Sequence, residues 1–224
     1  MVGVFIGIQV ANWNETQTNK KQLIISLERL DKEVSQNISN INLILNHYQA
    51  SSKNMEIGRE ALNACDYSPE NQAALESLMF QFVEDVLPNF VTEVLDQLGR
   101  QDRYRPLLSL SFQDSLSHYS ARIAEEHEQL TSHYNNLWAY HVNYHSSVSA
   151  YFSGNPIYKG DTSDFEGWGF KLAQPFEIVC KDASFRNRFI NTIGFFTSIN
   201  MRLKRFKAET IEFQEVLKSE IGEQ

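Results

Sequence analysis

Hydrophobic residues recur three or four positions apart in three long stretches of this chain, which is the pattern of an amphipathic helix. The first stripe consists of Leu23, Leu27, Leu30, Val34, Ile38, Ile41, Leu45 and Tyr48. The second consists of Leu116, Tyr119, Ile123, His127, Leu130, Tyr134, Leu137, His141, Tyr144, Val148 and Tyr151. The third consists of Phe189, Ile193, Phe196, Leu203, Phe206, Phe213, Leu217 and Ile221. These stripes predict three long helices, the second spanning 108–151 and the third 185–221.

Shorter helices are expected between the long ones, over 53–64, 70–86 and 90–98. Ser68 and Pro69 look like an N-cap followed by proline at the first helical position, and Asp182 or Ser184 is the expected N-cap of the last helix. The predicted fold class is all-α. It is an antiparallel bundle of long helices with shorter connecting helices, in a single helical domain over 14–224.

One stretch, 152–184, lacks helical spacing and contains most of the turn-forming residues of the second half of the chain. Its aromatic residues favour a loop that packs against the domain rather than a free one. We therefore expect one long irregular loop here, with short strand pairing around 170–179 as an alternative.

The first thirteen residues are mostly apolar and end at a tryptophan set among asparagines. Trp13 then occupies the position of a membrane-interface residue, at the end of a transmembrane helix leaving the bilayer. The run is too short to span a membrane by itself. Either 1–13 is the C-terminal part of a truncated transmembrane or membrane-anchoring helix, or it starts a short amphipathic or buried helix.

The segment from Gly3 to Glu15, with its Asn-Trp-Asn-Glu box, resembles a family of uncharacterised bacterial single-span membrane proteins with a domain of unknown function. The resemblance continues more weakly at 91–95, 111–119 and 185–189. It implies a single-pass protein of the bacterial inner membrane with a periplasmic helical domain, and it implies no catalytic residue. The chain departs from the family pattern because it lacks the basic N-terminus and half of the span.

Charge and cysteine content narrow the possible partners. A net charge of −8 and a pI near 5.3 argue against nucleic acid, because phosphate binding requires a basic surface. The two cysteines, Cys65 and Cys180, match no metal spacing. In an oxidising compartment they could form one disulfide, and in the cytosol they would more often be two small buried residues.

Histidines and aromatic residues of the second long helix are the candidate ligand contacts. His141 and His145 lie four positions apart and could reach one metal ion if another helix supplied further ligands. The other candidate ligand contacts are residues of the helical stripe, residues next to it, and a loop tryptophan flanked by glycines. They are His127, Tyr134, Trp138, His141, Tyr144 and Trp168. The alternative is that these residues are ordinary core groups with satisfied hydrogen bonds.

Sequence motifs for catalysis are absent, including nucleophile elbows, phosphate-binding loops and metalloprotease signatures. We therefore expect a non-enzymatic interaction or sensing module with no cofactor. Its expected partners are the bilayer, through the N-terminal helix, and a second copy or another protein. Two alternatives stay open: a small-molecule- or metal-binding enzyme that uses the histidine-bearing helix 108–151 and the glycine-rich loop, and a structural envelope component.

Overall fold

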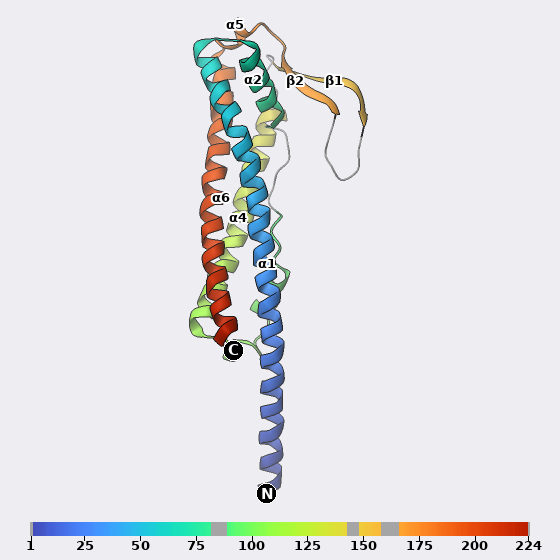
Figure 1. The fold of residues 1–224 in the computed structure, drawn as a ribbon, viewed down its shortest axis with the longest axis vertical. Coiled ribbons are helices and arrows are strands. Elements are labelled where there is room, and N and C mark those ends of the chain that lie inside the picture. The colour runs from blue at the N-terminus through green and yellow to red at the C-terminus, as the bar shows by residue number, and fades with distance from the viewer. Residues whose placement is uncertain (1, 82–88, 143–147, 158–165, 224) are drawn as a thin grey trace. The chain divides into compact units, whose positions relative to one another are not determined.

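The computed structural model describes residues 2–81, 89–142, 148–157 and 166–223. The helices are α1 (Val2–Ala64), α2 (Pro69–Gln81), α3 (Glu93–Gly99), the 3₁₀ turn η1 (Arg105–Leu107), α4 (Leu110–Val142), α5 (Phe176–Val179) and α6 (Ala183–Glu223) (Figure 1). Two strands, β1 (Val148–Ile157) and β2 (Glu166–Leu172), form a hairpin. The fold is an all-α helical bundle, as the sequence predicts, with this hairpin added.

The chain divides into two compact units. Unit 1 comprises Met1–Leu43, Pro88–Gln129 and Leu203–Gln224, and unit 2 comprises Ile44–Leu87 and Leu130–Arg202. Both units contain parts of the long helices, because α1 and α6 each contribute to both. The candidate site described below lies within unit 1.

Buried positions along the long helices alternate in steps of four and three residues. In α1 the buried series is Leu23, Leu27, Leu30, Val34, Asn37, Ile41, Ile44, Tyr48, Ser51, Met55, Gly58 and Leu62. In α6 it is Phe185, Phe189, Thr192, Phe196, Ile199, Leu203, Phe206, Thr210, Phe213, Leu217 and Glu220. An average spacing of 3.5 residues is the seam of a coiled coil, so these helices pack with coiled-coil periodicity.

Polar residues occupy several of these seam positions. At those points the predicted stripe contains the next residue along the chain instead. Asn37 is buried in place of the predicted Ile38, and Glu126 is buried in place of the predicted His127, which is exposed. The prediction is wrong at these points because the seven-residue repeat continues through a polar residue whose side chain finds hydrogen-bond partners.

In unit 1, two polar side chains of α1 hold the segment that leads into α3. The carboxylate of Glu33 accepts hydrogen bonds from the backbone N–H groups of Val94 at 2.8 Å and Leu95 at 3.1 Å. The side-chain amide of Asn37 both donates to the carbonyl of Val91 and accepts from its N–H, each at 2.8 Å. α1 therefore supplies the anionic cap that the first turn of α3 needs.

The start of α4 in unit 1 is capped in a similar way from α6. Glu220 is 3% exposed, and its carboxylate accepts hydrogen bonds from the backbone N–H of Ser109 at 3.0 Å and from the Ser109 hydroxyl. α6 is also joined to α1, because Gln214 donates to Asp31 at 2.8 Å and to Ser35 at 2.7 Å. These contacts place parts of α1, α4 and α6 side by side within the unit (Figure 1).

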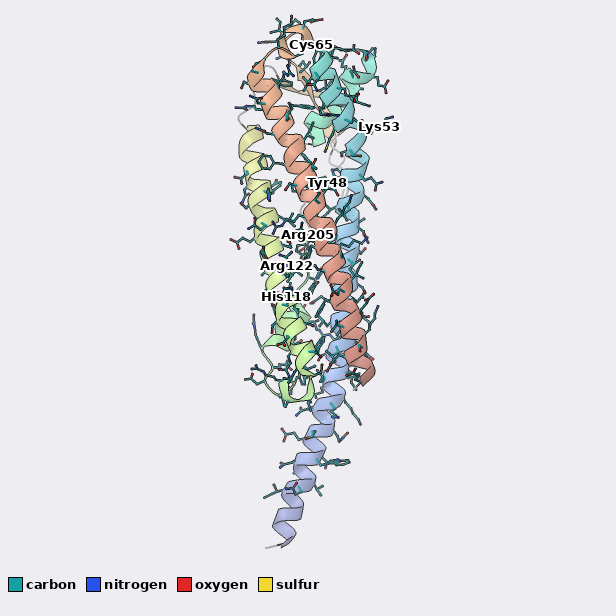
Figure 2. The ribbon with its side chains drawn as sticks, turned by 90° about the vertical axis from the view of Figure 1, so that its left-hand side faces the viewer. Tyr48, Lys53, Cys65, His118, Arg122 and Arg205 are labelled. Carbon is teal, nitrogen blue, oxygen red and sulfur yellow. A yellow bond between two sulfur atoms is a disulfide. The ribbon has the colours of Figure 1, made fainter. Side chains whose placement is uncertain are left out.

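In unit 2, Cys65 and Cys180 form a disulfide with a Cα–Cα distance of 5.4 Å, so the predicted pairing is confirmed (Figure 2). Cys65 follows the last residue of α1 and adopts a left-handed conformation, with φ of 50°. The N–H of Asp66 reaches back to the carbonyl of Ala61 at 3.1 Å, which is the helix-ending arrangement that usually carries glycine. The disulfide links this end of α1 to the segment between α5 and α6.

The hairpin replaces the end of the predicted helix 108–151 and the start of the predicted irregular loop 152–184. β1 pairs antiparallel with β2 from Val148 opposite Leu172, with a register irregularity between Phe152 and Ile157. The helical spacing predicted through Tyr151 is wrong because this β-branched and aromatic stretch obtains its backbone hydrogen bonds from a partner strand. Within the predicted strand pairing at 170–179, residues 176–179 form α5 instead.

Two helix boundaries test the sequence prediction directly. Asp182 caps α6 as expected, because its carboxylate accepts a hydrogen bond from the N–H of Ser184 at 2.8 Å. The separate helix predicted over 53–64 is wrong, because α1 continues to Ala64. The hydroxyl of Ser51, where the apolar stripe lapses, bonds to the carbonyl of His47 within the helix at 3.1 Å, so its burial requires no break.

The membrane prediction is contradicted. Among the residues that the structure describes, none of the helices combines the length and the apolar character needed to cross a membrane. The apolar residues at the start of α1 give way to polar ones from Asn12 onward, and Trp13 is 63% exposed. This finding overturns the expected single-pass placement in the inner membrane.

Tyr48 makes the stability of the protein sensitive to alkaline pH. Its ring packs edge-on against Phe196 in unit 2, 5.3 Å between centroids, and burial raises its pKa from 10.0 to about 12 (Figure 2). A raised pKa in the folded state means that this contribution is complete below pH 10 and is lost as the pH rises through 12. We expect a loss of roughly 2–3 kcal/mol of unfolding free energy across this window.

The measurement is urea unfolding of the wild type and of Tyr48→Phe at several pH values between 9 and 12. The variant has no hydroxyl to ionise, so its stability should fall less steeply than that of the wild type. Equal slopes for the two proteins would show that Tyr48 does not cause the alkaline loss.

Candidate groove between α4 and α6

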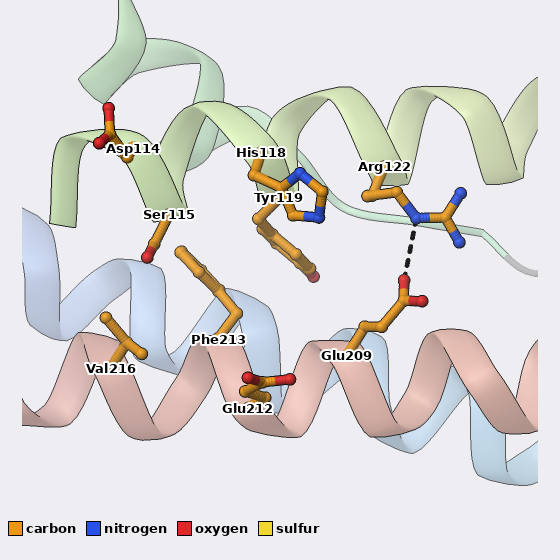
Figure 3. A pocket seen from close by; sticks show the side chains of 9 residues that line it. All are labelled: Asp114, Ser115, His118, Tyr119, Arg122, Glu209, Glu212, Phe213 and Val216. Carbon is orange, nitrogen blue, oxygen red and sulfur yellow. Dashed lines mark hydrogen bonds and ion pairs between the residues drawn. The ribbon is translucent and has the colours of Figure 1, made fainter. Parts of the chain in front are cut away.

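A groove of about 350 Å³ runs between α4 and α6 in unit 1 (Figure 3). From α4 it is lined by Asp114, Ser115, His118, Tyr119 and Arg122. From α6 it is lined by Glu209, Glu212, Phe213 and Val216. On α4, Asp114, His118 and Arg122 recur every four residues and therefore lie on one face of the helix, along the edge of the groove.

The floor of the groove is aromatic. Tyr119 and Phe213 stack with their ring centroids 4.2 Å apart and their planes 8° apart, and Tyr119 also lies parallel to Phe206 at 6.3 Å. Figure 3 shows the Tyr119 ring reaching from α4 toward α6 beside Phe213. Since both rings occupy seam positions, the same residues that hold the two helices together also form an apolar base for the groove.

The hydroxyl of Tyr119 is a polar group inside this core. The residue is 3% exposed, and within the described part of the chain its hydroxyl makes no hydrogen bond of good geometry. Burial raises its pKa, while the nearby side chains of Asn37 and Thr210 act in the opposite direction. The phenol therefore stays protonated at neutral pH, with its hydroxyl buried near Asn37 and Thr210.

Arg122 closes one end of the groove with a cluster of ion pairs. Its guanidinium bonds to Glu209 across the groove at 2.9 Å, to Glu126 on its own helix at 2.9 Å, and to Glu125 (Figure 3). Partial burial alone lowers the pKa of Arg122, but hydrogen bonds to Glu209 and Glu125 raise it, and the net pKa lies above its usual value. Arg122 therefore stays positively charged and links α4 to α6 through these ion pairs.

Replacing Arg122 with methionine should destabilise the protein by about 2 kcal/mol, because Glu126 would remain buried without this partner. The cost stays below that of a fully buried pair because Arg122 is 20% exposed and Glu209 can turn toward water. Urea unfolding measures the change. Arg205→Met removes an exposed arginine of α6 and is the matched control, so an equal loss in both variants would contradict the argument.

None of the six predicted ligand contacts is among the described residues that line this groove. His127 is exposed and does not line it, and Tyr134 is half-buried in unit 2. Trp138 and His141 belong to α4 and Trp168 to β2, but their side chains lie outside the described part of the chain. Tyr144 and the second predicted metal ligand, His145, lie outside the described residues altogether.

The described residues contain no candidate metal site. Over residues 2–81, 89–142, 148–157 and 166–223, no group of three or more histidine, cysteine, aspartate or glutamate side chains is arranged to hold an ion. The groove itself contains Asp114, His118 and Glu212, but they are not gathered around one point. The pair His141 and His145 stays a prediction.

Sequence reasoning missed most of the groove residues. Glu209, Glu212 and Arg122 read as ordinary helix charges, since the partners Arg122 and Glu209 are 87 residues apart in the chain. The sequence feature that could have indicated the groove is the four-residue spacing of Asp114, His118 and Arg122 beside the apolar stripe.

Comparison with known proteins returns no match: no family model, no curated protein and no solved structure is similar to this chain. The resemblance of its first fifteen residues to a bacterial membrane-protein family therefore stays a prediction.

Proposed function

We propose that this protein is a non-enzymatic interaction or sensing module, and that its ligand enters the groove between α4 and α6. The observation that carries the proposal is the combination of an aromatic floor, Tyr119 and Phe213, with polar side chains along both edges. Ligand sites are mostly apolar hollows with a few convergent polar groups, and spaces between the helices of a bundle are common places for them.

Binding fits the groove better than catalysis does. Ser115 and His118 both line it, but within the described chain no hydrogen bond joins them or orients the imidazole. Nucleophilic catalysis by serine depends on such a hydrogen bond and on a third group that fixes the base. The guanidinium of Arg122 already bonds to three carboxylates, so its role is structural.

A ligand held between the two helices would also have a route to affect the protein. The groove lies between α4 and α6, and these helices contact each other through the Tyr119–Phe213 stack and the Arg122–Glu209 ion pair. A bound molecule that contacts both helices stabilises this arrangement by its differential affinity for it. Sensing would then consist of a change in how firmly α4 and α6 are joined.

The proposal is tested by filling the groove. Val216 lines it, and Val216→Trp should occupy its space, whereas Glu215→Trp places the same side chain at an adjacent exposed position outside the lining. Native mass spectrometry of the full chain, purified under mild conditions, should reveal a bound small molecule in the wild type and in Glu215→Trp. The bound mass should be lost from Val216→Trp, with circular dichroism confirming that this variant is folded.

Two results would overturn the proposal. One is the same bound mass in folded Val216→Trp as in the wild type. The other is a bare wild-type chain whose thermal midpoint, across a library of small molecules, responds no differently from that of Val216→Trp.

A further inference from the structure

The charges around the groove identify the class of ligand that it would accept. Two carboxylates on its lining, Asp114 and Glu212, are exposed, and neither forms an ion pair within the described part of the chain. They come from opposite sides, Asp114 from α4 and Glu212 from α6 (Figure 3). In Figure 3 Asp114 points away from α6, so Glu212 is the unpaired carboxylate that a ligand between the two helices would meet directly.

The single arginine of the groove does not cancel these charges. Its guanidinium is shared by Glu125, Glu126 and Glu209, each within 2.9 Å. Three carboxylates line the groove, Asp114, Glu209 and Glu212, against one guanidinium, and His118 and Tyr119 are the other titratable residues of the lining. The formal charges of the lining residues therefore sum to a negative value, as do those of the whole chain, whose net charge is −8.

The floor sets the second requirement. Half-buried Val216 and the small exposed edges of Phe213 and Tyr119 present apolar surface between the polar side chains of the two helices. A fully hydrated inorganic cation gains nothing from such a surface, whereas a ligand with an apolar body does. At about 350 Å³ the groove is at the lower end of the volumes of small-molecule sites, which excludes a bulky occupant.

We propose that the groove binds a small amphipathic amine, in which a protonated ammonium group faces Glu212 and an aryl or alkyl body lies on the Tyr119–Phe213 floor. This inference rests on the proposed function, because it names the ligand class of the same groove.

The test is isothermal titration calorimetry of the full chain with phenethylammonium as the probe. Two molecules with nearly the same body but a different head group, phenethyl alcohol and hydrocinnamate, serve as neutral and anionic comparisons. We expect phenethylammonium to bind most tightly, with an affinity that falls as salt is added. Glu212→Gln should weaken it about fivefold, because an exposed charge pair contributes on the order of 1 kcal/mol.

A matched variant separates a specific contact from general attraction. Glu215→Gln removes the same charge from an exposed position of α6 outside the groove lining, and it should leave the affinity unchanged. Equal weakening by Glu212→Gln and Glu215→Gln would overturn the inference, because the amine would then respond only to net charge.

The remaining outcomes distinguish the two proposals. If the alcohol or hydrocinnamate binds as tightly as the amine and Val216→Trp abolishes that binding, the groove is a ligand site but the amine inference is wrong. If phenethylammonium binds the wild type and Val216→Trp equally, it does not use the groove, and the inference is again wrong. If none of the three probes binds, the amine inference fails, while the bound mass in native spectrometry still decides the proposed function.

Discussion

Reducing the disulfide between Cys65 and Cys180 should lower the free energy of unfolding by about 5 kcal/mol. The bond closes a loop across a sequence separation of 115 residues, and the entropy that such a link removes from the unfolded chain corresponds to this magnitude. It also holds the end of α1 against the segment before α6, where Cys180 is fully buried. We expect a large shift of the urea midpoint on reduction of the wild type.

Two cysteine-free variants distinguish the effect of losing the disulfide from the effect of the left-handed backbone at position 65. Cys65→Ala/Cys180→Ala keeps a side chain at a φ of 50°, which favours glycine, whereas Cys65→Gly/Cys180→Ala relieves that strain. The glycine variant should therefore be more stable than the alanine variant by about 1 kcal/mol. An unchanged midpoint in both variants, relative to the oxidised wild type, would contradict the stabilising role of the disulfide.

Replacing Glu33 with alanine should cost about 4 kcal/mol, because it leaves two buried backbone donors without their acceptor. Those donors are the N–H groups of Val94 and Leu95 in the first turn of α3, and Glu33 itself is 7% exposed. A seven-residue helix has little stability of its own, so the loss should appear first as release of α3 from α1.

Hydrogen exchange gives the most specific readout of this change. The amides of Val94 and Leu95 should exchange much faster in Glu33→Ala than in the wild type, and Glu33→Gln should lie between them because it retains one acceptor oxygen. Glu28→Ala, at an exposed position of α1, is the matched control and should leave both amides protected. Equal protection of these amides in Glu33→Ala and Glu28→Ala would show that the carboxylate does not hold α3.

Local sequence signals predicted the starts of α2 and α6 and most positions of the apolar seams. Asp182 caps α6, and Pro69 is the first residue of α2, because these residues act on their immediate neighbours. The cysteine pairing could be named as one of two alternatives, since the chain contains only two cysteines. Leu23, Leu27 and the residues that follow them are buried because helical spacing depends only on the helix itself.

Features that depend on distant partners could not be predicted from the sequence. The burial of Glu33 and Asn37 requires α3, which lies more than fifty residues further along the chain. The strand at Val148–Ile157 has helical spacing in part, and only its pairing with β2 decides its conformation. The groove needs two helices placed together, so its carboxylates look like ordinary solvated charges when each helix is considered alone.

The central question about this protein is whether a small molecule binds in the groove between α4 and α6. Chemical-shift mapping of the isotopically labelled full chain, titrated with the molecule recovered from it by native mass spectrometry or with phenethylammonium, measures this residue by residue. We expect the shifted amides to cluster at 114–122 and 209–216 and the shifts to vanish in Val216→Trp. Shifts located elsewhere, or identical in the wild type and in Val216→Trp, would show that the molecule does not bind in this groove.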